Sequence, residues 1–354
     1  MSFIKYIKIA FILSILSFSK LALSIEIQVN YNEHANILHY LDNLSLFPAE
    51  HVNNNYRDFW EIKNFIQDED NYYLKMYAKV RKKYYKNLNL LLSRPENIRD
   101  PIAEAFYKAN SLINALDAVK KIVSLDDYII IENSINHFFK RIEKLILNKN
   151  HMIEEAEYIK HYYESDEGLG YIKKMCNFYN VSPEKIKIYI VYEHQSNMSS
   201  AYQFSDMIIL RRSEKNGSIT TYDTKNLKEF FSIIMHEIAH YLSSQINNEL
   251  ANNYKLKFKA SLKKGVIENW QKSSTLFIEE PLAVMVGQMY YLHMTDPDHF
   301  EYFSEFYNQP LVNIISKLCY PLIWHYLSNN KPIDDIIFVN LAKSLNQVSN
   351  LLEN

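Results

Sequence analysis

Two histidines four residues apart, the first followed directly by a glutamate, stand in the segment IIMHEIAHYL, residues 233–242. On an α-helix, positions i and i+4 lie one turn apart on one face, so His236 and His240 would point their imidazoles at a common position. Neutral imidazoles bind zinc well, at about 2.0–2.1 Å. Glu237 would lie about 100° around the helix from His236, beside such a metal rather than on it. This spacing predicts a zinc site with Glu237 as general base.

The rest of the circumference of this helix is apolar and includes Phe230, Phe231, Ile234, Ile238 and Leu242. A helix of this kind is buried, so its imidazole and carboxylate groups need partners, and a metal ion would be one. The alternative is a chance match, which is expected in a few per cent of chains with 12 histidines in 354 residues. A catalytic zinc site needs three protein ligands, so a third ligand has to be found.

The search for a third ligand excludes one arrangement at once. A metzincin helix would continue as H-E-x-x-H-x-x-G-x-x-H, but Ser243 and Ile246 occupy the positions of the glycine and the third histidine. Downstream, the apolar segment LFIEEPLAV, residues 276–284, contains Glu279 and Glu280. Carboxylates in such a segment are costly to bury unless they are paired or bound to a metal. Either glutamate could therefore complete the site.

The combination of H-E-x-x-H with a later E-x-x-A resembles the gluzincin metallopeptidases of the peptidase-MA-like group. In this resemblance IEEPLA aligns Glu280 with the metal-binding glutamate and Ala283 with the small residue after it, and Glu279 remains the alternative ligand. The resemblance covers residues 186 to about 330 and implies a zincin-like catalytic domain with one Zn²⁺ ion and a peptide or protein substrate. The metal ligands that it implies are His236, His240 and Glu280.

Two further segments take part in the resemblance. Residues 199–210, SSAYQFSDMIIL, resemble the edge strand that lines the substrate cleft of the family. Residues 320–330, YPLIWHYLSNN, resemble its aromatic segment, which makes Tyr320 a candidate donor to the oxyanion, with an ordinary core tyrosine as the alternative. The chain departs from the family at Pro281, which replaces a glycine. Because proline is tolerated only in the first turn of a helix, Pro281 predicts that Glu280 lies at or near a helix start.

The elements that must position these residues follow from periodicity. Residues 35–179 repeat apolar side chains every three or four positions, as in 102–123, which predicts helices. After Pro183 the period changes to two, and 186–192 and 201–212 read as strands, followed by a loop with an optional third strand and a helix from Thr224. We therefore expect a mostly helical α+β fold. A helical N-terminal region, 25–180, would precede a gluzincin-like metallopeptidase domain with a small sheet, 181–354.

Composition and the first residues limit the protein's class and location. Five glycines in 354 residues favour long helices, and a net charge of −2 gives no electrostatic footprint for nucleic acid. Residues 1–24 have Lys5 and Lys8 ahead of an apolar run and end in Ala-Leu-Ser, which predicts a signal peptide cleaved after Ser24. No later stretch reaches about 18 unbroken apolar residues, so we expect no transmembrane segment in the mature chain.

Together these features predict an exported, periplasmic or extracellular, zinc-dependent metallopeptidase. Two alternatives stay open: a catalytically inactive zincin-like binding module, and a helical structural protein with a fortuitous H-E-x-x-H. The two cysteines, Cys176 and Cys319, carry no metal motif. In an oxidising compartment they could form a disulfide, or they could be two separate buried thiols.

Overall fold

The chain folds as a mostly helical α+β protein around a small mixed sheet, as predicted from its periodicity. Its computed structural model describes residues 25–47, 55–63, 65–87, 98–146, 149–193, 200–212, 222–263, 266, 275–298, 300–302 and 304–352. The predicted signal peptide, residues 1–24, lies outside the described residues. So does most of the loop in which a third strand was left open, residues 213–221.

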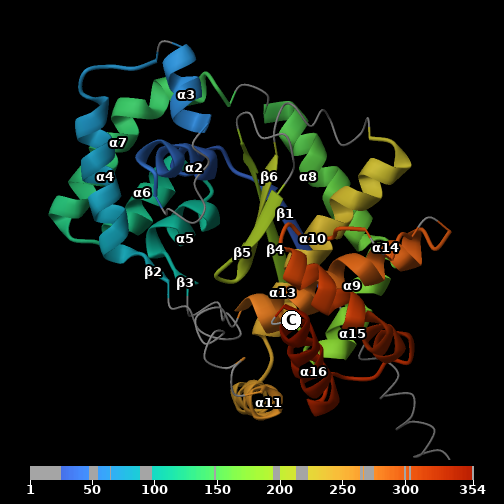
Figure 1. Ribbon diagram of the computed structural model, residues 1–354. Helices are drawn as coiled ribbons and strands as arrows, with labels where there is room; N and C mark the ends of the chain where they lie inside the picture. Colours follow the sequence, from blue (N-terminus) through green and yellow to red (C-terminus); the bar gives the residue numbers. More distant parts are fainter. Residues whose placement is uncertain are drawn as a thin grey trace, which may run out of the picture.

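The sheet has four strands in the order β1, β4, β6, β5 (Figure 1). β1 pairs in parallel with β4, β4 pairs in parallel with β6, and β5 runs antiparallel to β6 at one edge. The strands have the bounds β1 Glu26–Tyr31, β4 Lys185–Tyr192, β5 Ser200–Phe204 and β6 Met207–Arg212. Because β1 pairs with β4, the sheet combines strands from both sides of the boundary predicted at residue 180.

Two features of the sheet differ from the prediction. The single strand expected at 201–212 is a hairpin, in which β5 and β6 are joined by a two-residue turn at Ser205 and Asp206. Ser205 takes a positive φ of 51°, which tight hairpin turns require. β1 was not predicted, since its alternation of buried Ile27 and Val29 with more exposed neighbours spans only six residues. Such a short pattern is weak without its pairing partner.

Six helices between β1 and residue 143 form an N-terminal lobe on one side of the sheet, at the left of Figure 1. α2 is the centre of this lobe, because nearly all of its side chains are buried. A two-stranded ribbon, β2 Lys86–Asn87 with β3 Ile98–Arg99, accompanies the helices. The helices are α2 Glu33–Ser45, α3 Asn55–Ile62, α4 Asp70–Tyr84, α5 Pro101–Lys108, α6 Leu112–Lys120 and α7 Leu125–Glu143.

Two helices, α8 Lys149–Glu164 and α10 Thr224–Ser244, pack against the other side of the sheet, at the right of Figure 1. A third helix, α9 Asp166–Tyr179, packs on these two helices. α8 packs along β1, and the buried guanidinium of Arg212 in β6 donates to both carboxylate oxygens of Glu155 in α8 at 2.8 and 2.9 Å. α10, which carries the H-E-x-x-H motif, packs against β5 and β6. The sheet therefore sets the position of the motif helix.

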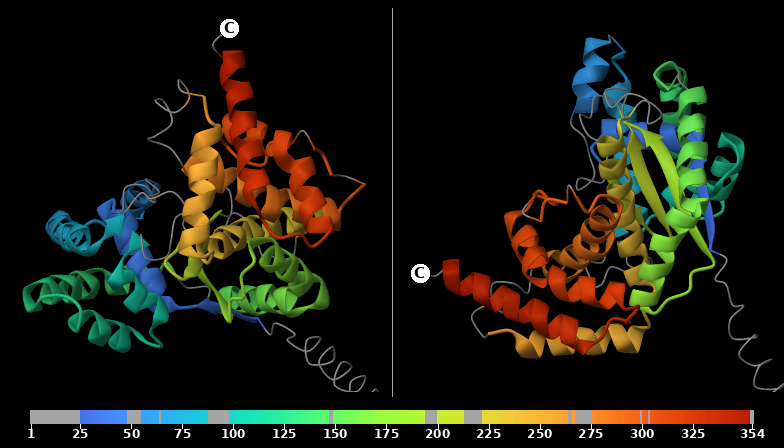
Figure 2. Two further views of the ribbon diagram at one scale, coloured as in Figure 1. Left: turned by 90° about the horizontal axis from the view of Figure 1, so that it is seen from below. Right: turned by 90° about the vertical axis from the view of Figure 1, so that its right-hand side faces the viewer.

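The C-terminal helices complete the fold beside α10. α11 lies alongside α16 (Figure 2), where the rings of Tyr254 and Phe338 stack at 4.4 Å. α13, a π-helical stretch η4 and α14 follow one another without a break and pack against α10 and α15. The bounds are α11 Asn248–Ser261, α13 Thr275–Ala283, η4 Val284–Met289, α14 Tyr290–Thr295, α15 Pro310–Ser328 and α16 Asp335–Leu352.

The expectation that Glu280 lies at a helix start is wrong. Pro281 lies inside α13, so Glu280 is well within the helix. A proline at this position cannot donate the backbone hydrogen bond that an α-helix requires, and the wider η4 turn follows within three residues. The helix continues because residues 282–286 are almost completely buried between α10 and α15. Tertiary packing here outweighs the local preference of proline.

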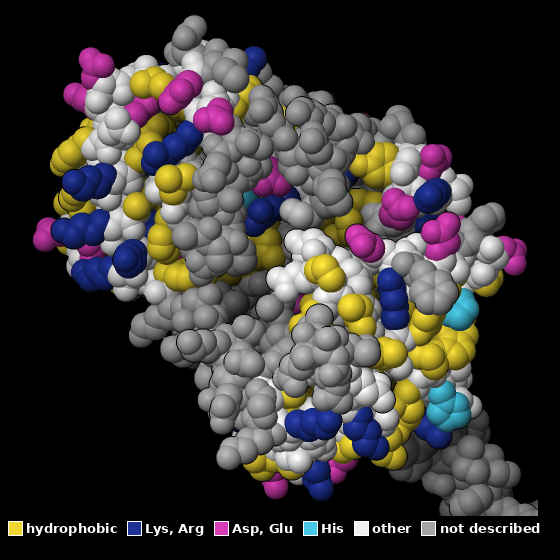
Figure 3. Space-filling view, viewed as in Figure 1, with side chains coloured by type: hydrophobic (Ala, Val, Ile, Leu, Met, Phe, Trp, Pro, Cys, Tyr) yellow, Lys and Arg dark blue, Asp and Glu magenta, His cyan; other side chains and the backbone are white. Residues whose placement is uncertain are grey.

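The surface and the cysteines complete this description. Lys and Arg side chains lie scattered among acidic and hydrophobic ones on the face shown in Figure 3. No helix in the described part of the chain is both long and apolar enough to cross a bilayer. Cys176 and Cys319 are separate buried thiols, and the Sγ atom of Cys319 lies 3.2 Å from the Oγ atom of Ser344. Cys176 and Cys319 therefore do not form a disulfide in this structure.

Candidate metal centre

Helix α10 brings the two predicted histidines together. The helix begins at Asp223, whose side chain accepts a hydrogen bond from the Asn226 backbone at 2.7 Å, a standard N-cap. Its apolar residues are buried against the sheet and η4, which fixes the rotation of the helix. The Nε2 atoms of His236 and His240 lie 3.1 Å apart. Both imidazoles thus face one point, as the i, i+4 spacing predicts.

Helix α13 supplies a carboxylate to the same point. The Oε2 atom of Glu280 lies 3.3 Å from His236 Nε2 and 3.4 Å from His240 Nε2. Glu279 is also buried, but it lies toward Tyr179: burial raises the pKa of this tyrosine, and the negative charge of Glu279 adds to the effect. The structure therefore brings Glu280, rather than Glu279, to the two histidines.

The three atoms have the spacing of a tetrahedral zinc site. Ligands at 2.0–2.1 Å in a tetrahedron are separated from each other by about 3.3 Å. The three measured separations are 3.1, 3.3 and 3.4 Å. Neutral imidazole nitrogens and an ionised carboxylate are all acceptors, and within the described residues the buried Oε2 atom of Glu280 has no hydrogen-bond partner. A cation would satisfy all three atoms, so the residues fit zinc.

The electrostatics of the triad point the same way. Although burial opposes protonation, the adjacent Glu280 carboxylate raises the pKa of His240 to about 9. Burial also works against ionisation of Glu280, but the two histidines hold its pKa well below the usual range. A carboxylate this deep requires positive charge beside it. A proton on His240 and a zinc ion are two ways to provide that charge, and zinc binding would release the proton.

Glu237 lies between the histidines and the edge strand β5. Its carboxylate accepts a hydrogen bond from the backbone N–H of Gln203 in β5, and the Gln203 side chain donates to Ser244 Oγ at 3.2 Å. Burial raises the pKa of Glu237, and the charge of Glu280 adds to this effect. A carboxylate with a raised pKa is a better proton acceptor than an exposed one. Glu237 is thus placed beside the triad and prepared for proton transfer.

A tyrosine that the sequence analysis did not identify also contacts the triad. The ring of Tyr307 stacks on the ring of His236, with centroids 5.9 Å apart and planes 19° from parallel. Burial raises the pKa of Tyr307, and the negative charge of the nearby Glu280 carboxylate adds to this effect. Tyr307 lies in the irregular segment between α14 and α15. No periodicity or motif marks that segment, so the sequence carried no signal for it.

Tyr320, the predicted oxyanion donor, lies elsewhere. It is buried in α15, where its hydroxyl donates to the Met289 carbonyl at 3.2 Å and lies 3.0 Å from His293 Nδ1. Phe300 and Trp324 pack around it. Among the described tyrosines, Tyr307 rather than Tyr320 contacts His236 and Glu280.

A glycine allows α10 and η4 to approach closely at the site. A Cβ atom on Gly287 would lie 2.6 Å from the Cα atom of His236 and 2.6 Å from the carbonyl oxygen of Met235. Both are backbone atoms, which cannot move aside as a flexible side chain can. Gly287 therefore fixes how near η4 comes to the first histidine, and through the continuous helix it sets the distance to Glu280.

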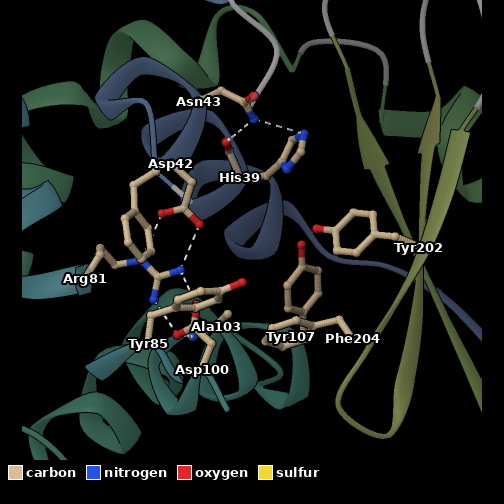
Figure 4. Close-up of a pocket in the computed structure, with 11 residues that line it drawn as sticks. His39, Asp42, Asn43, Arg81, Tyr85, Asp100, Ala103, Tyr107, Tyr202 and Phe204 are labelled. Atoms are coloured by element: carbon tan, nitrogen blue, oxygen red, sulfur yellow. Dashed lines mark hydrogen bonds and ion pairs between the residues drawn. The ribbon is translucent and has the colours of Figure 1, made fainter. Parts of the chain in front are cut away.

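A small cavity lies between β5 and the N-terminal lobe (Figure 4). Tyr202 of β5 and Tyr107 of α5 line it, and their hydroxyls point toward each other. Behind them Arg81 forms ion pairs with Asp42 at 2.8 Å and Asp100 at 2.5 Å. The cavity measures about 30 Å³, room for a water molecule but not for a peptide side chain. It is a polar junction that holds the lobe to the strand next to Glu237.

Comparisons with protein families, with curated proteins and with solved structures found no match for this chain. The resemblance to the gluzincins therefore rests on the motifs in residues 233–242 and 278–284. The structure adds the geometry of these two segments, which are far apart in the sequence and packed together in the fold. Their side chains form one triad of two imidazoles and a carboxylate, with a further glutamate beside it.

Proposed function

We propose that the protein is a zinc-dependent metallopeptidase that hydrolyses peptide bonds. His236, His240 and Glu280 would hold one Zn²⁺ ion. The observation that carries this proposal is the triangle of their three ligand atoms, with sides of 3.1, 3.3 and 3.4 Å. Two imidazoles and one carboxylate form the ligand set of a catalytic zinc site, which keeps a fourth position open.

Each residue of the site has a distinct part in this chemistry. A bound zinc ion would supply Lewis-acid chemistry, polarising a peptide carbonyl and lowering the pKa of a water molecule to about 7. Glu237 would accept a proton from the attacking water and pass it to the leaving amine. The N–H of Gln203 orients the Glu237 carboxylate for this transfer. Tyr307 packs on the ring of His236 and would help to orient it, and the oxyanion donor role of Tyr320 stays a prediction.

Export of the protein is part of the proposal. The charge pattern, apolar run and small residues of positions 1–24 support a signal peptide that ends at Ser24. The substrate would then be a peptide or protein in the periplasm or outside the cell. N-terminal sequencing of the exported protein should give Ile25 as the first residue, and a chain beginning at Met1 in the membrane fraction would contradict it.

The test of the activity combines metal analysis with a cleavage assay. Purified protein should contain one zinc ion per chain and cleave members of a mixed peptide library, and a zinc chelator should abolish cleavage. Zinc without cleavage would identify the inactive binding module instead. Purified protein that takes up no zinc, even when zinc is added, would identify a helical structural protein with a fortuitous motif.

A further inference from the structure

The segment that carries Tyr307 to the triad is held by one side chain. Residues 304–309 form no helix or strand, so the usual ladder of backbone hydrogen bonds is missing there. The Oδ1 atom of Asn313 accepts hydrogen bonds from the backbone N–H groups of Phe306, at 2.9 Å, and Tyr307, at 3.0 Å. Its Nδ2 group donates to the Tyr307 carbonyl. Asn313 is itself only 4% exposed.

These three hydrogen bonds fix the backbone on both sides of the Tyr307 side chain. An amide is the side chain suited to this task, because it offers an acceptor and a donor in one plane. The N–H of Asn313 in turn bonds to the Gln309 carbonyl at 3.3 Å, in the first turn of α15. The position of Tyr307 is thereby tied to the start of α15. The segment is therefore held in place by its contacts with the buried helix α15 and not by regular secondary structure of its own.

The direction in which Tyr307 points depends on this anchor. Its ring stacks nearly parallel on the ring of His236, with the two centroids 5.9 Å apart. Groups that surround metal ligands orient them, and losing such a partner typically costs about 10- to 100-fold in metal affinity or activity. Asn313 therefore reaches the ligand His236 through one intervening residue, Tyr307.

We propose that Asn313 is a positioning residue of the metal centre, which acts by holding the Tyr307 ring against His236. This inference rests on the proposed zinc site. Asn313 itself touches neither the histidines nor the carboxylate in the contacts described above. Its contribution to metal binding must therefore pass through Tyr307, which separates this role from a general contribution to folding.

A double-mutant cycle tests the proposal, with zinc affinity measured by competition against a chromophoric chelator. Tyr307→Ala removes the ring that stacks on His236, and Asn313→Ala removes the three hydrogen bonds to the segment. Each single variant should lose about 10- to 100-fold in zinc affinity. The double variant should bind zinc no more weakly than the single variant with the lower affinity, because both changes break the same contact. Losses that multiply, or an Asn313→Ala variant with wild-type affinity, would overturn the proposal.

Controls separate this role from folding. Asn329 lies at the other end of α15, is exposed and donates to the His325 carbonyl at 2.7 Å, so Asn329→Ala should keep wild-type zinc affinity. If Asn313→Ala fails to fold by circular dichroism, Asn313→Asp replaces it, since a carboxylate still accepts from both N–H groups but cannot donate to the Tyr307 carbonyl. Its effect on zinc affinity should then differ between the wild-type and Tyr307→Ala backgrounds. Equal effects in the two backgrounds would overturn the proposal.

Failure of this inference and failure of the proposed function give different results. A wild-type protein that binds zinc but cleaves no peptide would refute the peptidase activity. The positioning role of Asn313 would still be decided by the zinc affinities in the double-mutant cycle. A wild type that binds zinc and cleaves peptides, with independent effects in the cycle, would refute the positioning role alone. A wild type that binds no zinc would refute both.

Discussion

The backbone N–H of Gln203 in the edge strand donates to the carboxylate of Glu237 in the motif helix, beside a second contact from the Gln203 side chain to Ser244 Oγ at 3.2 Å. This contact holds the proposed base beside His236 and His240 without making it a ligand. It also puts the base at the unpaired edge of β5 within the described sheet. A substitution of Glu237 can therefore separate proton transfer from metal binding.

Glu237→Gln should keep zinc and the fold but lose hydrolysis. The amide oxygen can still accept from Gln203, and the packing of α10 is preserved, but an amide cannot take a proton from water. We expect a loss of about 10²- to 10⁴-fold in kcat with KM little changed. As a control, His236→Ala should lose both zinc and activity. Equal hydrolysis by wild type and Glu237→Gln, with zinc present in both, would refute the assigned base.

Glu280→Gln should release zinc, whereas Glu279→Gln should retain it. Both substitutions preserve side-chain size, but only the Glu280 carboxylate lies 3.3 and 3.4 Å from the histidine nitrogens. An amide is a much weaker zinc ligand than a carboxylate. The zinc content of each variant after dialysis, measured by elemental analysis, shows which glutamate is the ligand. The reverse result would make Glu279 the third ligand.

Gly287→Ala should weaken zinc binding and destabilise the protein by about 1–3 kcal/mol, because the added methyl group would collide with the backbone at His236 and Met235. Gly170 is the matched control, since it lies in α9 and a Cβ atom there would have nothing within 4 Å. Gly170→Ala should stabilise the protein by about 0.5–1 kcal/mol. Urea unfolding and zinc titration of both variants provide the check. If the two substitutions have the same effect, the close helix contact does not matter.

Asp127→Asn should make the protein less stable at neutral pH but not in strong acid. Burial raises the pKa of Asp127, but hydrogen bonds from Lys83, Ser124 and Tyr84 outweigh this and lower it to about 2. A carboxyl with a lowered pKa stabilises the fold above its unfolded-state pKa of about 4, and this contribution disappears as the pH falls towards 2. We expect a difference on the order of 1 kcal/mol at pH 7. Urea unfolding of both proteins at pH 7 and near pH 2 should show the gap closing.

The parts of the site that could be predicted depend on local spacing. His236 and His240 meet because they are four residues apart on one helix, and the helix is set by its own apolar periodicity. Glu280 was reached through a second motif, but the choice over Glu279 depends on the rotation of α13 against α10. A rotation of this kind is a property of packing, and the local preference of Pro281 for a first helical turn even predicted the wrong helix boundary.

The parts that were missed depend on contacts between distant segments. β1 is recognisable as a strand only when β4 lies beside it, and Tyr307 is recognisable as a site residue only when its segment lies over His236. Asn313 shows why no simple pattern exists. A single amide replaces the regular hydrogen bonding on which sequence patterns depend.

The pairing of β1 with β4 also determines the order in which the molecule can be built. Glu26 pairs with Lys185, so every helix from α2 to α9 is contained in the loop that this pairing closes. Closing such a loop costs chain entropy before the strand contacts repay it, so parallel pairing over this separation is slow. The helices can form first, whereas the sheet is complete, and α10 is packed on it, only after β1 has paired with β4. A polypeptide crossing a membrane amino end first would thus deliver β1 early but could not assemble its candidate metal centre until most of the chain had emerged.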